Sequence, residues 1–320
     1  MPFASKSGFN QFQEILMGTW TNQVLPNATH GEGGTGNPLS YTVMPIPQDP
    51  SYILKNFTYY EAIKFESNNS DLAPTPVALI AHNRGGSSLQ AAAALFYGQH
   101  IRFADGPGKD QLVHSENGAW LNLATGKNLV GPYPPPPEEG IIMDDPNQQP
   151  LNITIAKQMS VPHGNSVLAL GSFCEPQDGK PLIPDAPSVL PTPADDLDTC
   201  PYIIKLDQPD NYQNPLPDFT ANTNKPLQIA VCLIKPDRYI HWTVSTKNQG
   251  HTINIPFEQR VSDVTEYAAS YWLLSNDGGK SYPYLAYTQR IVMKFTINGK
   301  QKHYSFPHVT SNVVTKAEIG

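Results

Sequence analysis

Two acid–base side chains, His114 and Glu116, stand two residues apart in a segment with strand-like composition. Residues two apart on a strand share one face, so the imidazole and the carboxyl group would point in the same direction. Such a pair can form a local hydrogen bond at a strand end. It can also contact a ligand and supply acid–base catalysis to it, and the pattern leaves both readings open.

A second candidate for chemistry is His308, which follows Pro307 where another strand-like segment begins. A histidine that binds haem iron must be a neutral imidazole that projects into a dry pocket. If His308 faces an interior, the two-residue period places Thr310 and Asn312 on the same face, which would then be polar near its opening. The alternative is a histidine at an exposed rim.

Several common chemistries are disfavoured because their sequence motifs are absent. The 9 histidines include no His-Glu-x-x-His zinc pattern, and the 3 cysteines are too widely spaced for a zinc motif or a disulfide framework. The glycine-rich stretches 31–36 and 85–86 do not continue into a phosphate-binding loop, and 164–167 lacks the second glycine of a serine-hydrolase elbow.

Charge and hydropathy restrict the partners. Lys+Arg minus Asp+Glu is 21 − 28 = −7, so there is no positive excess to neutralise phosphates, and we expect no nucleic acid partner. No apolar run approaches the length needed to cross a bilayer, and the first residues do not read as a secretory signal. We therefore expect a soluble, cytoplasmic protein.

The elements that must position these residues are mostly strands. With 32 prolines and 23 glycines in 320 residues, short alternating segments are bounded by turn residues throughout the chain. The expected strands are 39–44, 57–65, 77–83, 89–97, 111–114, 118–123, 151–159, 166–171, 228–234, 239–245, 252–255, 284–298, 303–306 and 309–316. Helical spacing predicts a short amphipathic helix at 9–17, before Gly18, and a helical turn at 261–274.

Many successive strands and few helices favour a mainly β fold, an antiparallel up-and-down barrel of about 8 to 12 strands, because closure removes exposed strand edges. Residues 1–320 read as one elaborated barrel domain. Its interruptions are a proline-rich connection at 132–150 and a Pro/Asp-rich insertion at 175–224. A barrel of this size can hold one small molecule in its lumen.

The order of the motifs resembles the nitrobindin group, haem-binding barrels of the calycin type that are similar in shape to fatty-acid-binding proteins. The matching positions are Gly18 and Trp20 at the first strand, His114, Glu116 and Gly118 in the middle, Met293 near the end, and His308 at the haem ligand. The resemblance implies haem b, with iron bound by His308. It also implies Trp20 and Met293 around the cofactor, with the first indole plugging the closed end. We further expect Trp120 to be one of the aromatic residues that line the cofactor pocket.

Three functions follow as alternatives. The leading expectation is a barrel that binds haem b and supports nitric oxide, peroxynitrite or peroxide chemistry, which includes a haem-dependent isomerase or peroxidase-like activity. The second is a metal-free carrier of an apolar ligand such as a lipid or secondary metabolite. The third is a cofactor-free isomerase or cyclase in which His114 or Glu116 gives acid–base help.

Overall fold

The computed structural model describes most of the strand-forming parts of the chain. The described residues are 6–22, 41–48, 51–67, 79–82, 89–92, 94–103, 108–122, 155–161, 165–174, 176–186, 188–193, 222–247, 252–253, 263–297 and 302–317. The proline-rich connection at 132–150 and much of the insertion at 175–224 lie outside them.

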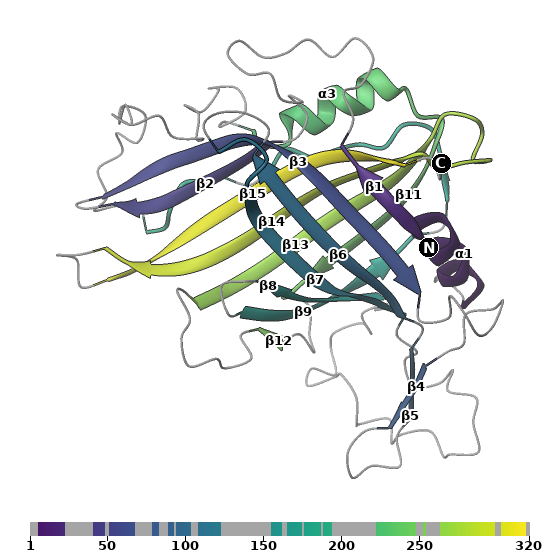
Figure 1. Ribbon diagram of the computed structural model, residues 1–320, viewed down its shortest axis with the longest axis horizontal. Coiled ribbons are helices and arrows are strands. Elements are labelled where there is room, and N and C mark those ends of the chain that lie inside the picture. The colour runs from purple at the N-terminus through teal and green to yellow at the C-terminus, as the bar shows by residue number, and fades with distance from the viewer. Residues whose placement is uncertain are drawn as a thin grey trace, which may run out of the picture.

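Ten of the described strands form a closed antiparallel barrel (Figure 1). In order around the barrel they are β1 (Gly18–Thr21), β3 (Ser51–Ser67), β6 (Ala94–Phe103), β7 (Leu112–Asn122), β8 (Ile155–Val161), β9 (Asn165–Phe173), β11 (Arg238–Ser245), β13 (Asp263–Ser275), β14 (Tyr284–Thr296) and β15 (His303–Lys316). Pairing of β15 with β1 closes the ring. The up-and-down barrel predicted from the sequence is confirmed.

One place in the barrel wall is shared by two short strands. Between β15 and β3, β1 occupies one end and β2 (Tyr41–Gln48) the other. Among the remaining strands, β10 (Gln177–Asp178) pairs with β11, and β12 (Thr252–Ile253) pairs with β9. A separate two-stranded ribbon, β4 (Leu79–His82) and β5 (Leu89–Ala92), projects beyond one end of the barrel (Figure 1).

The predicted N-terminal helix is confirmed as α1 (Lys6–Leu16), which lies at one end of the barrel (Figure 1). Its apolar side chains Phe12 and Leu16 are fully buried, and the Trp20 indole N–H donates to the Leu16 carbonyl at 2.7 Å. The turn from α1 into β1 uses Gly18 at φ +113°, a left-handed conformation that favours glycine. These contacts close that end of the lumen.

Two sequence expectations about helices and strands are wrong. The predicted strand 228–234 belongs to helix α3 (Lys225–Ile234), which has proline in its first turn and buries Leu227, Val231 and Ile234 on the outer wall. A short apolar run does not distinguish a strand from a buried helix. The described part of the predicted helical turn at 261–274, residues 263–274, lies in β13, where a β-bulge puts one extra residue between Val264 and Glu266. The bulge accounts for the three-residue step from Val264 to Tyr267, both of which are buried, and this step resembled helical spacing.

The expected break near Pro307 is also absent, because β15 runs continuously from 303 to 316. Pairing with β2 begins only at Val309, so the missing N–H of the proline is not needed in that ladder. None of the helices among the described residues is long and apolar enough to cross a bilayer.

Candidate functional site

The lumen changes character along the barrel axis. Next to α1 lies an aromatic floor, defined as Phe12, Trp120 and Trp242, whose ring centroids are 4.8 to 6.4 Å apart. Along the inner face of β7, residues Trp120, Gly118, Glu116 and His114 then step away from α1 at the two-residue period of a strand. The polar groups therefore begin directly above the aromatic floor.

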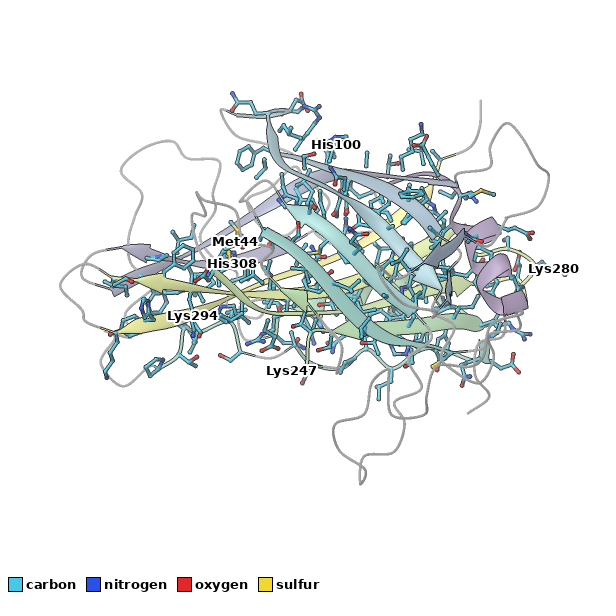
Figure 2. The ribbon with its side chains drawn as sticks, turned by 90° about the horizontal axis from the view of Figure 1, so that it is seen from below. Met44, His100, Lys247, Lys280, Lys294 and His308 are labelled. Atoms are coloured by element: carbon cyan, nitrogen blue, oxygen red, sulfur yellow. The ribbon has the colours of Figure 1, made fainter. Side chains whose placement is uncertain are left out.

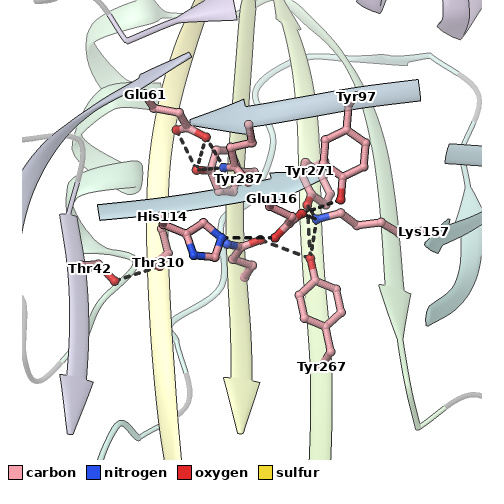
Figure 3. A network of polar contacts seen from close by, with 12 residues as sticks. Thr42, Glu61, Tyr97, His114, Glu116, Lys157, Tyr267, Tyr271, Tyr287 and Thr310 are labelled. Atoms are coloured by element: carbon pink, nitrogen blue, oxygen red, sulfur yellow. Dashed lines mark hydrogen bonds and ion pairs between the residues drawn. The ribbon is translucent and has the colours of Figure 1, made fainter. Parts of the chain in front are cut away.

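The first polar group, the lysine cluster, consists of Lys157, Glu116, His114, Tyr97, Tyr267 and Tyr271 (Figure 3). The Lys157 ammonium lies 3.0 Å from Glu116 Oε1 and donates to the hydroxyls of Tyr267 at 2.8 Å and Tyr271 at 3.0 Å. Three partners account for its three hydrogens. Tyr97 donates to the same carboxyl oxygen of Glu116, and His114 Nε2 lies 3.8 Å from the other oxygen.

The charges of the lysine cluster stabilise each other. Burial alone would raise the pKa of Glu116, but the ammonium of Lys157 and the imidazole of His114 lower it to about 2. Burial alone would lower the pKa of Lys157, and the Glu116 carboxylate instead raises it well above its usual value. The pair is therefore ionised, although Glu116 is only 2% exposed and Lys157 only 3%.

The second polar group, the glutamate cluster, consists of Glu61, Tyr287, Gln99, Asn312 and Tyr59, all of which are buried. Glu61 and Tyr287 are labelled in Figure 3. The Tyr287 hydroxyl lies 2.8 Å from Glu61 Oε1 and 2.7 Å from Oε2. The side-chain amides of Gln99 and Asn312 each donate to one carboxyl oxygen of Glu61. The two clusters adjoin, since Gln99 is the cross-strand partner of Glu116.

The glutamate cluster has no compensating cation among the described residues. Burial raises the pKa of Glu61 above its usual value, while the hydrogen bonds from Tyr287, Gln99 and Asn312 act in the opposite direction. The charged group that acts on Glu61 is the Glu116 carboxylate, which raises its pKa further. Burial therefore raises the pKa of both glutamates, and their pKa values shift in opposite directions because, as far as the structure is described, only Glu116 contacts a cation.

Beyond both clusters, lumen-facing side chains become accessible to solvent. On β14 the inner face passes from buried Leu285 and Tyr287 to half-buried Gln289 and Ile291. On β15 it passes in the same way from Val314 and Asn312 to Thr310 and His308, and on β7 from Glu116 to His114. We call the part of the lumen lined by these five half-buried residues, His114, Gln289, Ile291, Thr310 and His308, the chamber.

The structure brings together two of the residues singled out from the sequence, since His114 and Glu116 share the inner face of β7. His308 also faces the chamber, from β15 beside the β2 residue Met44 (Figure 2). Met293 is buried two residues beyond Ile291 on β14. Trp20 and Trp120 instead lie at the α1 end of the lumen, on the far side of the polar clusters from His308.

The hydrogen bond of His308 bears on whether this histidine could bind haem iron. Its Nε2 lies 3.0 Å from the carbonyl oxygen of Pro45, which can only accept, so Nε2 carries the proton in this contact. Histidine ligands usually donate from Nδ1 to such an oxygen and bind metal through Nε2. The arrangement of His308 is the reverse, and it does not fit haem held through Nε2.

Sequence reasoning missed Lys157 and Glu61. Each is a charged residue on an otherwise apolar face, Lys157 between Ile155 and Met159 on β8, and Glu61 between Tyr59 and Ile63 on β3. A charged residue at an inward position of a strand is the signal that could have found both. Among the described residues there is no group of three or more His, Cys, Asp or Glu that could hold a metal ion.

Comparisons with known proteins give little further information. No family model and no curated protein matches the chain. Among solved structures, the chain is similar to the crystal structure of Rv2717c from M. tuberculosis, with a TM-score of 0.37 and 12% sequence identity over 96% of each chain. This likeness is too distant to bear on function.

Proposed function

We propose that this barrel binds a small organic molecule in the chamber. The observation that carries the proposal is the change from fully buried to half-buried lumen positions just above the polar clusters, which indicates that solvent enters the barrel there. Barrels of about this size hold single small ligands in their interiors. The ligand would be largely uncharged, with its polar atoms near His114 and Gln289 and its apolar part near Ile291.

The buried ion pair beneath the chamber supports the same proposal. Burying an ammonium and a carboxylate costs desolvation energy, and hydrophobic residues of similar size often stabilise a protein more. Ionised groups on an inner wall are thus weak evidence for stability and more often mark a functional site. In this reading, Lys157 holds Glu116 ionised and Glu116 positions His114 toward the ligand.

Filling the chamber tests the proposal. Nile red, a neutral dye whose fluorescence rises in apolar surroundings, is titrated into the protein and into Thr310→Phe, which places a ring among the chamber residues. We expect at least about fivefold weaker binding, because overpacking by this much costs about 1–3 kcal/mol. The matched control is Thr296→Phe on the neighbouring strand, at an exposed position outside the chamber.

Equal dye affinity in the protein and in a folded Thr310→Phe variant would show that the chamber is not the binding site. Native mass spectrometry of the purified protein supplies a second readout. A carrier is expected to release an organic molecule and no iron, and this molecule should be absent from Thr310→Phe.

Haem bound through His308 stays a separate prediction of the resemblance to nitrobindins. It is tested by adding hemin and recording the Soret band in the protein and in His308→Ala. A band that depends on His308 would support haem as the ligand and would require the contact with Pro45 to break. A missing band, or one that His308→Ala leaves unchanged, removes His308 as the iron ligand.

A further inference from the structure

The glutamate cluster forms one side of the chamber floor. On β14, Tyr287 lies two residues from Gln289, and on β15, Asn312 lies two residues from Thr310, so cluster and chamber share inner strand faces. Figure 3 shows Glu61 and Tyr287 beside the lysine cluster. A ligand that rests on the floor would therefore lie next to both polar groups, in which Tyr287 is 1% exposed and Glu61 2%.

The hydrogen bonds around Glu61 indicate where its proton is. The hydroxyl oxygen of Tyr287 is within 2.8 Å of both carboxyl oxygens, but a phenol has only one hydrogen to donate. The second contact is satisfied when Glu61 itself carries a hydrogen and donates it to Tyr287. In that arrangement the hydrogen of Tyr287 can turn to another acceptor, and the hydroxyl of Tyr59 is one such partner within reach.

The surroundings of Glu61 favour the neutral form. Within the described part of the chain, the titratable groups that face it are Tyr59 on its own strand, Tyr287 from β14 and Glu116 from β7, and none of them is a cation. The other contacts come from the neutral amides of Gln99 and Asn312. Burial raises the pKa of Glu61, and the negative charge of Glu116 adds to this.

We propose that protonated Glu61 and Tyr287 act as a hydrogen-bond donor pair for an oxygen acceptor of the ligand, so that the chamber takes a carbonyl compound or a phenol. The proposal rests on the proposed function, because it names the ligand class of the same chamber. A tyrosine hydroxyl backed by a neutral carboxylic acid is suited to stabilise an oxygen that gains negative charge. The ionised Glu116 with His114 supplies the accepting side of the same site.

The first test is infrared spectroscopy, because the carbonyl stretch of a protonated carboxyl group is separate from that of a carboxylate. At neutral pH we expect a protonated carboxyl band in the protein that is lost in Glu61→Gln. A spectrum in which this substitution removes a carboxylate band instead overturns the proposal. This test needs no ligand, so it is independent of whether the chamber binds one.

The second test uses para-nitrophenol, whose phenol and phenolate forms differ in visible absorption. The protein is expected to bind it with a lowered apparent pKa, and Tyr287→Phe to lose that lowering with about tenfold in affinity, the effect of one hydrogen bond to a charged oxygen. Glu61→Gln keeps a neutral donor and should retain part of the effect. Equal spectra and affinities in the protein and in Tyr287→Phe would overturn the donor role.

The variant Thr310→Phe distinguishes failure of the donor-pair proposal from failure of the chamber as a binding site. If para-nitrophenol binds and Thr310→Phe weakens it but Tyr287→Phe does not, the chamber stands and the donor pair is wrong. If neither para-nitrophenol nor Nile red binding responds to Thr310→Phe, the chamber itself is wrong as a binding site.

Discussion

The lysine cluster and the glutamate cluster place the same side chain in two different electrostatic settings within one lumen. Glu116 and Glu61 are equally buried, each at 2% exposure, and each is hydrogen-bonded to a tyrosine hydroxyl. Glu116 also contacts the Lys157 ammonium, whereas the other donors to Glu61 are neutral amides. The comparison teaches that the partner, more than the depth of burial, decides whether a carboxyl group in a barrel is charged.

The largest expected loss of unfolding free energy comes from replacing only one partner of the Lys157–Glu116 ion pair. Lys157→Met leaves the Glu116 carboxylate buried without its cation, which is expected to cost about 3–5 kcal/mol of unfolding free energy. Urea unfolding at neutral pH measures it. The double variant Lys157→Met/Glu116→Gln should recover most of the loss, and a double variant as unstable as the single one would contradict the pairing.

A fall in pH should change the contributions of the two glutamates to the unfolding free energy in opposite directions. The pKa of Glu116 is lowered to about 2 from an ordinary 4.5, so its stabilisation is present above pH 4.5 and is lost as pH falls toward 2, about 3 kcal/mol in all. Glu61 has a raised pKa, so its contribution is present below pH 4.5 and is lost as pH rises through its folded value. The unfolding free energy is measured as a function of pH in the protein and in both variants. We expect its decrease toward acid pH to disappear in Glu116→Gln, and its decrease toward higher pH to disappear in Glu61→Gln. Unchanged slopes in both variants would refute this assignment.

Removing one tyrosine hydroxyl from each cluster is a finer test. Tyr97→Phe removes a donor to a charged carboxylate and is expected to cost about 1.5–3 kcal/mol, while Tyr287→Phe removes a partner of a neutral acid and should cost about 0.5–1.5 kcal/mol. The substitutions are chemically identical, so each variant is the control for the other in thermal and urea unfolding. Losses in the reverse order would mean that Glu61 carries the charge.

The smallest effect is expected from Glu61→Gln. An amide has nearly the shape of a protonated carboxyl group and the same charge, so the unfolding free energy at neutral pH should change by no more than about 1 kcal/mol. The equivalent change Glu116→Gln leaves Lys157 without its carboxylate and should destabilise far more. Similar losses in the two variants would remove the distinction between the clusters.

Local patterns in the sequence were sufficient to predict that the chain forms a barrel of strands. Turn residues around alternating segments predicted the barrel, helical spacing before Gly18 predicted α1, and the two-residue period predicted that His114 and Glu116 share a face. These features depend on neighbours only a few residues away. Where local signals were ambiguous, as in α3 and at the bulge in β13, packing against the barrel decided the outcome.

The partners inside the lumen were decided by the tertiary structure alone. Asn312 is 251 residues from Glu61, and Tyr267 is 110 residues from Lys157, yet closure of the ring brings each pair into contact. The sequence showed which way a strand residue could point, because direction follows from the alternation of the backbone. It did not show which side chain would face it across the lumen, because that depends on the register of every strand pair between them.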